Sequence, residues 1–410
     1  MKVLIVSQYF WPENFQINDV VKTLIKKGHS VDVLTGKPNY PDGKIFSGYS
    51  SWNTSKEEWN NAVIYRVPLI TRGEKSVIRL ILNYFSFVFF GGIVGAWLLR
   101  NKQYNVIFVY APSPILQAIP AIFIGWLKAC PVILWVQDLW PQSLEATGYV
   151  HNKLILRFVS NLVRWIYRHV DLLLVQSRSF IKPVSLMSAN IPVRYYPNSV
   201  DTFFSRPANT SIPESSVLDK GFSILFAGNI GTAQAVETIV EAAYLLKDNQ
   251  DINFVILGSG SRLEWMNNQI KQHQLKNLHL LGRLPVKTMP AFMQKASSLL
   301  VSLTDQPIFA MTVPNKVQAY MASGKPILAC LNGEGARVVT DAKAGISIPA
   351  EDAQGLADAV LQLYQMSDKE RDKLGENGRS YYKTHYDHEK LVDQLIEYFD
   401  NASNSYKRSK

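Results

Sequence analysis

Apolar strands that alternate with helices constrain this chain more than any other feature of its sequence. Lys2–Ser7 and Ser30–Thr35 have the apolar pattern of buried strands, and a helical segment separates them. The same order returns at Gly221–Ala227, which runs through a glycine turn into a helical pattern over 236–247. Alternation of this kind indicates parallel sheets covered by helices. We therefore expect an α/β chain with doubly wound, Rossmann-like sheets.

The length of 410 residues favours two domains rather than one. A stretch rich in Ser, Asn, Thr and Pro over 202–220 is typical of a linker. We predict an N-terminal domain over 1–200 and a C-terminal domain over 201–384, with a last helix at about 385–406 that packs back onto the first domain. The two cysteines lie far apart, and the first residues lack the apolar core of a secretory signal, so we expect a cytosolic protein.

The positive charge of the chain belongs to its first half. Residues 1–200 carry 21 Lys and Arg against 10 Asp and Glu, a net +11, whereas residues 201–410 carry 22 against 23. Such a surface suits an acidic partner, for which nucleic acid and an anionic membrane are the usual candidates. The sequence has no recognisable RNA- or DNA-binding motif, so we expect no nucleic acid partner.

Leu80 to Leu99 is a run of twenty residues without a charge, long enough to cross a bilayer. The segments 62–67 and 104–110 on either side have strand patterns, and a single crossing would separate them across the membrane. A helix or helical hairpin that lies in the interface avoids this, with Gly91-Gly92 as the bend of a hairpin. A helix buried in the core is the alternative.

A second segment, from His151 to His169, has a basic stripe beside an apolar face. At about 100° per helical residue, four cations fall within an arc of about 60°. They are Lys153, Arg157, Arg164 and Arg168. A basic stripe next to an apolar, tryptophan-bearing face is typical of a helix on anionic lipid, and a solvated charged face is the alternative. We therefore predict an anionic membrane surface as a partner, bound through Leu80–Leu99 and Lys153–Arg168.

The segment 313–326, VPNKVQAYMASGKP, has the marks of a short helix with both ends defined. Pro314 suits the first helical position, and Gly324 suits the left-handed residue after the end. The start of such a helix offers free N–H groups and about half a positive charge. Asn315 and Lys316 stand there, so we predict a phosphate site. An ordinary capped helix is the alternative.

Loops with glycine follow three other strands of the second half. They contain Gly228, Asn229 and Gly231, then Gly258, then Arg283. Glycine lets the backbone come close to a phosphate, although the GxxG pattern is weak on its own.

In the first half, the loops that follow strands carry amide, aromatic and carboxylate groups. Glu13 and Asn14 follow the first strand, and Asn39 and Tyr40 follow the second. These groups suit hydrogen bonding and stacking against a sugar ring, although ordinary turns also use Asn, Pro and Gly. Asp138 follows a central strand, at the edge where parallel sheets bind their ligands. A helix cap or a loop aspartate is the alternative for Asp138.

We expect no metal and no other cofactor. The sequence has no Asp-x-Asp, no HExxH and no paired CxxC motif. An enzyme that uses nucleotide sugars without Asp-x-Asp would need lysine and helix dipoles to neutralise the diphosphate. The helix of segment 313–326 offers both.

Seven motifs stand at intervals along the chain: KVLIVSQYFWPE, LIKKGHSVDVLTGKPNYPDG, VQDLWPQS, PNSVDTFF, FAGNIGTAQ, VILGSGS and PNKVQAYMASGKPI. Together they resemble glycosyltransferase family 4, and the resemblance covers essentially the whole chain. The FWPE, PNYP and DLWP pieces look most similar to the WbuB-like subgroup, whose members resemble N-acetyl-L-fucosamine transferases of bacterial capsule and O-antigen assembly.

The resemblance implies the GT-B fold, with two Rossmann-like domains facing each other across a cleft, and a retaining transfer without metal. A UDP-sugar donor would bind the C-terminal domain, and an undecaprenyl-diphosphate-linked sugar would bind the N-terminal domain. The implied donor residues are Gly228, Asn229, Gly231, Gly258, Arg283, Asn315, Lys316 and Gln318, with Gln318 near the ribose. The implied acceptor residues are Glu13, Asn14, Asn39 and Tyr40. The enzyme would act at the cytoplasmic face of the inner membrane.

The chain departs from the family at several positions. The family commonly carries two glutamates eight positions apart, but Met311 and Ala319 stand at those positions here. Its usual Arg and Lys after the glycine turn are also absent, which leaves the diphosphate to Lys316 and backbone amides. Its N-domain histidine, near the reacting sugar, falls around Gln137-Asp138, so we predict Asp138 and Lys316 as the catalytic residues. A nucleotide-sugar 2-epimerase of the same fold and a non-catalytic nucleotide-sugar-binding subunit remain as alternatives.

Overall fold

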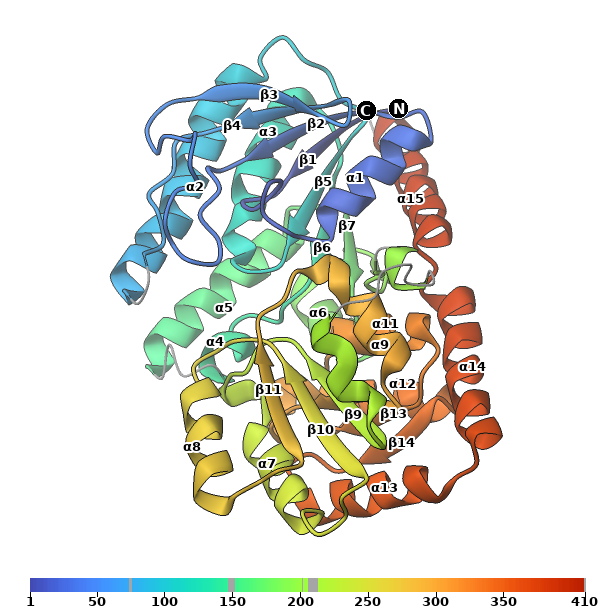
Figure 1. The fold of residues 1–410 in the computed structure, drawn as a ribbon. Coiled ribbons are helices and arrows are strands. Elements are labelled where there is room, and N and C mark those ends of the chain that lie inside the picture. The colour runs from blue at the N-terminus through green and yellow to red at the C-terminus, as the bar shows by residue number, and fades with distance from the viewer. Residues whose placement is uncertain (74–75, 147–151, 201, 206–212, 409–410) are drawn as a thin grey trace. The chain divides into compact units, whose positions relative to one another are not determined.

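The computed structural model describes residues 1–410 except 74–75, 147–151, 201, 206–212 and 409–410. The chain divides into two compact units. Unit 1 consists of Met1–Pro197 with Glu389–Lys410, and unit 2 consists of Asn198–His388. Each unit contains a sheet of mainly parallel strands with helices packed against it, as the alternation of strands and helices predicts (Figure 1). Part of the expected linker over 202–220 lies outside the described residues.

The described strands of unit 1 form one sheet in the order β3-β4-β2-β1-β5-β6-β7-β8. They are β1 (Lys2–Val6), β2 (Ser30–Thr35), β3 (Ser55–Trp59), β4 (Ala62–Arg66), β5 (Val106–Ala111), β6 (Val132–Val136), β7 (Leu172–Val175) and β8 (Val193–Tyr195). All neighbours are parallel except β3 and β4. Every residue of β5 and β6 is buried, which explains why these strands read as continuous apolar runs rather than as alternating ones.

The helices of unit 1 are α1 (Ile17–Lys26), α2 (Val77–Leu98), α3 (Ala118–Lys128), α4 (Gln142–Ala146), α5 (Lys153–Arg168), α6 (Ile181–Ser188) and α15 (His388–Arg408). Helix α15 lies beside α1, although the two are more than 350 residues apart in sequence (Figure 1). Lys26 Nζ lies 2.8 Å from the carboxylate of Glu389 at their junction. The apolar side of α15 joins the core of unit 1 through Leu395 and Phe399, both fully buried.

The apolar segment of unit 1 forms one unbroken helix, α2, so the suggested bend at Gly91-Gly92 is wrong. Gly91 and Gly95 serve close packing instead, whereas a Cβ at Gly92 would meet nothing within 4 Å. A Cβ at Gly91 would lie 3.3 Å from Pro120 of α3, and a Cβ at Gly95 would lie 2.8 Å from Leu34 of β2. Helix α2 is long and apolar enough to cross a membrane, by length and composition only. Only 28% of its most apolar stretch is buried, so the alternative of a wholly buried core helix is also wrong.

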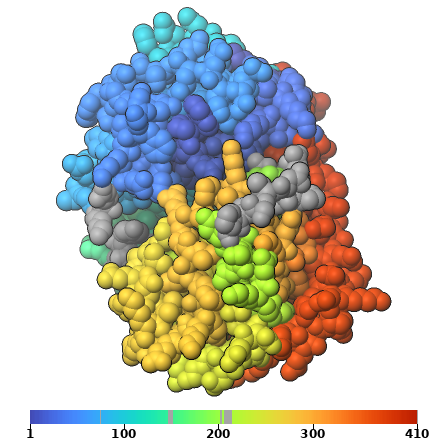
Figure 2. All heavy atoms as spheres, viewed as in Figure 1, coloured from blue at the N-terminus to red at the C-terminus, as the bar shows by residue number. Residues whose placement is uncertain are grey.

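The described strands of unit 2 form a parallel sheet in the order β11-β10-β9-β12-β13-β14. They are β9 (Phe222–Ala227), β10 (Ile252–Leu257), β11 (Leu278–Gly282), β12 (Ser298–Ser302), β13 (Ile327–Cys330) and β14 (Gly345–Ile348). The helices are α7 (Val236–Leu245), α8 (Leu263–His273), α9 (Met289–Lys295), α10 (Pro307–Ala310), α11 (Asn315–Ser323), α12 (Glu334–Asp341), α13 (Ala353–Gln365) and α14 (Asp368–His385). Figure 2 shows that side chains fill the spaces between the ribbons of Figure 1.

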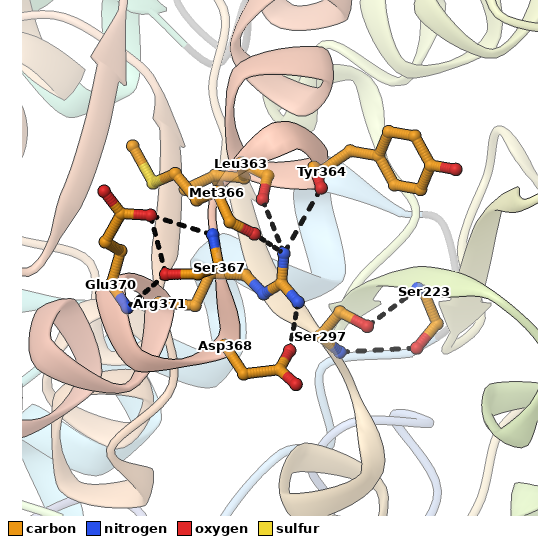
Figure 3. A network of polar contacts seen from close by, with 9 residues as sticks. All are labelled: Ser223, Ser297, Leu363, Tyr364, Met366, Ser367, Asp368, Glu370 and Arg371. Carbon is orange, nitrogen blue, oxygen red and sulfur yellow. Dashed lines mark hydrogen bonds and ion pairs between the residues drawn. The ribbon is translucent and has the colours of Figure 1, made fainter.

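The junction of α13 and α14 shows how the ends of neighbouring helices are satisfied (Figure 3). Arg371 donates to the carbonyls of Leu363 and Tyr364 at 3.0 and 3.3 Å, and also to that of Met366. A guanidinium at these carbonyls replaces the hydrogen bonds that a continuing helix would supply. Ser367 and Glu370 form a reciprocal capping box at the start of α14.

Candidate functional site

Helix α11 begins directly after Pro314 and ends at Gly324. Gly324 has φ 73° and ψ 38°, the left-handed conformation that glycine adopts without strain, which confirms the predicted end. Pro314 is extended, with ψ 138°, so it precedes the helix instead of filling the first helical position. The helix therefore begins with Asn315 and Lys316, and its first N–H groups have no partners within the helix.

Lys316 is held over the C-terminal end of β9. Its Nζ lies 3.6 Å from the centroid of the Phe226 ring, a cation–π contact with a buried aromatic residue. A Cβ at Gly228 would lie 2.5 Å from Lys316 Cε, so any other residue at 228 would displace the end of this side chain. Part of the lysine remains accessible, but enclosure of its ammonium lowers the pKa of Lys316 to about 7.

The two glycine loops of unit 2 interlock beside Lys316. A Cβ at Gly258 would lie 1.8 Å from the carbonyl oxygen of Gly228, and one at Gly260 would lie 2.2 Å from that of Ile230. Gly228 and Gly258 also have φ of 145° and 151°, outside the range that other residues adopt easily. These glycines are therefore required for backbone contact between the loops after β9 and β10.

Asn198 connects the first residues of unit 2 to the start of α11. Its Nδ2 donates to Asn315 Oδ1 at 2.8 Å, and its own Oδ1 is buried without a partner. Asn198 is 4% exposed whereas Asn315 is exposed. The bond therefore fixes the orientation of an exposed amide at the helix start.

The other residues of the predicted donor set have different surroundings. Asn229 is exposed and donates to Gln234 Oε1 at 3.0 Å, and Gly231 N donates to the same atom at 3.1 Å. Arg283 is exposed after β11. Gln318 is fully buried, and with its amide nitrogen as donor it bonds the carbonyl of Pro314 at 2.8 Å. Because this amide bonds to the backbone at the start of its own helix, we do not count Gln318 among the residues that would bind the UDP-sugar.

In unit 1, Glu13 and Asn39 belong to one buried loop network. Glu13 Oε1 accepts from the backbone N–H groups of Asn39 and Tyr40 at 2.8 and 2.7 Å, and Oε2 accepts from that of Phe10 at 3.2 Å. Burial raises the pKa of Glu13 to about 7, against the opposing effect of these three donors. Asn39 is fully buried and donates to the carbonyl of Lys37. Glu13 therefore holds the loops after β1 and β2 together, and Asn39 stabilises the second of these loops from within.

Tyr40 and Asn14 have side chains that solvent can reach. The ring of Tyr40 is 39% exposed and lies 5.6 Å from the ring of Tyr9 and 5.2 Å from that of Phe15. The guanidinium of Arg72 lies 5.2 Å from the Tyr40 centroid. An aromatic face beside a cation is a surface on which a sugar can stack. Asn14 is exposed next to this group.

Asp138 lies two residues beyond the end of β6, where the sequence predicts chemistry. It is partly exposed, and desolvation raises the pKa of its carboxyl to about 7. Burial, and after it the charge of Asp138, raises the pKa of the hydroxyl groups of Tyr110 and Tyr167. A carboxyl that titrates near neutral pH can act as a general base or as a general acid.

Comparison with known proteins identifies the chemistry that these units serve. Residues 209–381 match the family model described as glycosyl transferases group 1, which spans most of unit 2. WcaI of Escherichia coli, named as a candidate colanic acid biosynthesis glycosyl transferase, is 25% identical over 73% of this chain and 76% of its own length. The chain is a glycosyltransferase with the GT-B fold.

Solved structures agree with the fold of this glycosyltransferase. Sucrose-phosphate synthase from Thermosynechococcus elongatus superposes with a TM-score of 0.72 over 98% of this chain and 99% of its own, at 16% identity. Alr3699/HepE of Anabaena, solved in complex with UDP, superposes with a TM-score of 0.67 over 98% of this chain and all of its own, at 11% identity. At these identities the likeness to solved structures shows the fold alone.

Sequence reasoning missed some residues of the glycosyltransferase that the structure brings together. Phe226 and Asn198 both contact the start of α11, yet they lie about 90 and 117 residues before it. They stand in the motifs PNSVDTFF and FAGNIGTAQ, but nothing in these motifs shows that Asn198 and Phe226 contact the start of α11. No group of three His, Cys, Asp or Glu residues close enough for a metal ion occurs among the described residues.

Proposed function

We propose that this glycosyltransferase moves a sugar from a UDP-sugar bound by unit 2 to a lipid-diphosphate-linked sugar bound by unit 1, with retention of configuration. The setting would be the assembly of a bacterial surface polysaccharide, either capsule or O-antigen. The names of WcaI and of the UDP complex of HepE support this class of reaction. The motif resemblance suggests N-acetyl-L-fucosamine as the sugar and undecaprenyl as the lipid.

The arrangement of Lys316 is the observation that carries the donor side of the proposal. A lysine kept against Phe226 and Gly228 places its ammonium at the C-terminal edge of the sheet, beside the free N–H groups of α11. A diphosphate is the ligand that such a cation and helix start recognise. Lys316, Asn315 and the backbone of Gly228 would therefore stabilise the charge that develops on UDP as it leaves.

Asp138 would serve the reacting sugar on the acceptor side. Its carboxyl titrates near pH 7, so the ionised form can accept the proton of the attacking hydroxyl or stabilise positive charge on the sugar ring. Tyr40 would stack against the acceptor, with Asn14 close by. Glu13 and Asn39 would act only by holding the loop that carries Tyr40.

Helix α2 would place unit 1 on the cytoplasmic face of the inner membrane. Large apolar side chains project from it into solvent along its length: Ile78 at 71% exposed, Phe85 at 52%, Phe89 at 58% and Trp97 at 59%. A contiguous apolar surface of this kind on a single helix marks an interaction site. Because α2 also packs tightly on α3 and β2, it would lie in the interface instead of leaving the sheet to cross the bilayer.

Helix α5 supplies a second lipid-facing surface with the complementary charge. Leu154 and Phe158 are 77% and 65% exposed. The basic residues of the same helix, Lys153, Arg157, Arg164 and Arg168, have no salt bridge among the described residues. Free cations next to exposed apolar groups favour a surface of anionic phospholipid.

A transfer assay tests the proposal. The full chain is incubated with vesicles of anionic phospholipid, a panel of UDP-sugars that includes UDP-N-acetyl-L-fucosamine, and undecaprenyl-diphosphate-linked N-acetylhexosamines. Mass spectrometry of the lipid fraction should show one added sugar, and the aqueous fraction should contain an equal amount of UDP. Conversion of the nucleotide sugar without an acceptor would support an epimerase instead, and UDP binding without product would support a binding subunit.

A further inference from the structure

Three polar atoms in unit 1 are buried without a hydrogen-bond partner around the ends of β6 and β7. They are Gln137 Nε2, Gln176 Oε1 and the hydroxyl of Tyr167. The three residues are 8%, 5% and 0% exposed. Leaving a buried polar group unpaired is costly, and native proteins rarely do so unless water or a ligand completes the group. Three such atoms in one region therefore point to a ligand.

The positions of these residues bring them together. Strands β6 and β7 are parallel with Val136 opposite Val175, so Gln137 and Gln176 stand side by side just past the strand ends. Gln176 Nε2 donates to the carbonyl of Gln137 at 3.4 Å. Tyr167, on α5, lies near enough to Asp138 for the carboxylate to affect its hydroxyl. Gln137 also precedes Asp138 directly in the chain, so the three residues share one region at the ends of β6 and β7.

The chemistry of the group fits a neutral polyhydroxyl ligand. An amide N–H donates, an amide oxygen accepts, and a phenol can do either, so together they match sugar hydroxyls that are both donors and acceptors. No Lys or Arg belongs to the group, and the charge of Asp138 would repel a phosphate. Two of the residues follow adjacent strands of a buried sheet, which gives the rigid placement that discrimination between sugars requires.

We propose that Gln137, Tyr167 and Gln176 form a subsite that reads the hydroxyl groups of the acceptor sugar beside Asp138. This inference rests on the proposed transferase function. It assigns specificity to Tyr167 and Gln176, which stand in none of the seven motifs, and to Gln137, which stands in VQDLWPQS. Loss of one neutral hydrogen bond to the sugar should raise the acceptor KM by roughly 2- to 12-fold.

The test uses the full-length variants Tyr167→Phe and Gln176→Leu, with Tyr364→Phe as the matched control. Tyr364 is in unit 2, and its exposed hydroxyl donates a hydrogen bond to Asp251 Oδ2 at 3.1 Å. Initial rates are measured against undecaprenyl-diphosphate N-acetylglucosamine and against the UDP-sugar that the wild type uses, together with hydrolysis of that UDP-sugar in the absence of acceptor. Unfolding temperatures are measured in parallel.

The expected result is a higher acceptor KM in both variants, with the donor KM and the hydrolysis rate unchanged. Tyr167→Phe should also keep or raise the unfolding temperature, since the hydroxyl that it removes is unpaired. A lower unfolding temperature with an unchanged acceptor KM would show a structural role, and a changed donor KM would place the subsite on the donor sugar; either result overturns the inference. Should Gln176→Leu fold poorly, Gln176→Glu preserves its shape and must still raise the acceptor KM. A wild-type chain without any transfer would refute the proposed function itself.

Discussion

The ammonium of Lys316 lies 3.6 Å from the centre of the Phe226 ring, at the end of a buried strand. A lysine in this place is costly for the folded chain, because burial disfavours its charged form and lowers its pKa to about 7. A ligand that brings two phosphate groups to the start of α11 would offset that cost. This arrangement suits a donor-diphosphate site. The charge of Lys316 would lower the stability of the free protein, and it would raise the affinity for the donor.

The stability side of this relationship can be measured with Lys316→Met, which keeps an unbranched chain against Phe226 without the charge. The folded pKa of Lys316 is below its unfolded value of 10.5, so the unfolded state binds more protons between about pH 7 and 10.5 and wild-type stability rises with pH over that window. At pH 6.5 we expect the variant to unfold about 2–4 °C higher than the wild type. The difference should shrink toward pH 10 in calorimetric scans; a difference that is constant with pH would contradict the argument.

The pH dependence of catalysis should also reflect the lowered pKa of Lys316. Values of kcat/KM for the UDP-sugar report groups of the free enzyme, and Lys316 loses its charge above about pH 7. Asp138, acting as a base with a pKa of about 7, should give the rising limb below that pH. We expect a bell-shaped profile for the wild type. Arginine stays charged at all these pH values. The kcat/KM of Lys316→Arg, whatever its absolute size, should therefore rise with pH and then remain flat up to pH 9.

Glu13 should matter for stability, not for direct contact with the acceptor. Glu13→Ala would leave the N–H groups of Phe10, Asn39 and Tyr40 without their acceptor. A loss of about 2 kcal/mol or more in the free energy of unfolding is expected from urea titration. Asn14→Ala, one residue further along and exposed, is the matched control and should change stability by less than about 0.5 kcal/mol. Equal stabilities for the two variants would count against the loop network.

Membrane association should depend on the exposed face of α2 and should weaken with salt. Phe85→Glu places a charge at a side chain that is 52% exposed, so the fold should survive while binding to the bilayer falls. Removal of Arg157 should cost about 1 kcal/mol, or roughly fivefold in partitioning, at low salt. Sedimentation with phosphatidylglycerol vesicles checks both variants. Leu245→Glu, at a side chain that is 44% exposed on α7 of unit 2, is the control that should bind as the wild type does.

The sequence predicts most of the fold because parallel strands that are buried on both faces leave an unmistakable pattern. The continuous apolar runs at β5 and β6 and the glycine at the end of α11 show this. The path of α2 was harder to foresee. Gly91-Gly92 is compatible with a bend, and only the approach of Pro120 shows that Gly91 serves packing.

The candidate site could be predicted only in part. The prediction of Lys316 at a phosphate site was possible because the chemistry of a helix start depends on residues close together in sequence. The orientation of a loop side chain is not local: Glu13 and Asn39 have the composition of a sugar-binding loop, but they bond to the backbone. Gln318 lies one turn into α11, and its burial depends on the whole packing of unit 2. The pairing of Gln137 with Gln176 depends on strand register across 39 residues, which no short motif records.

Titration calorimetry with UDP tests the central claim most directly. The wild type, Lys316→Ala and the control Lys276→Ala, at an exposed lysine of the same unit, are compared at pH 6.5, where Lys316 is mostly charged. Charge-assisted contacts contribute about 1.5–3 kcal/mol each. We predict that UDP binds the wild type and Lys276→Ala equally and binds Lys316→Ala roughly 10- to 150-fold more weakly. Equal affinity of all three folded proteins for UDP would contradict the account.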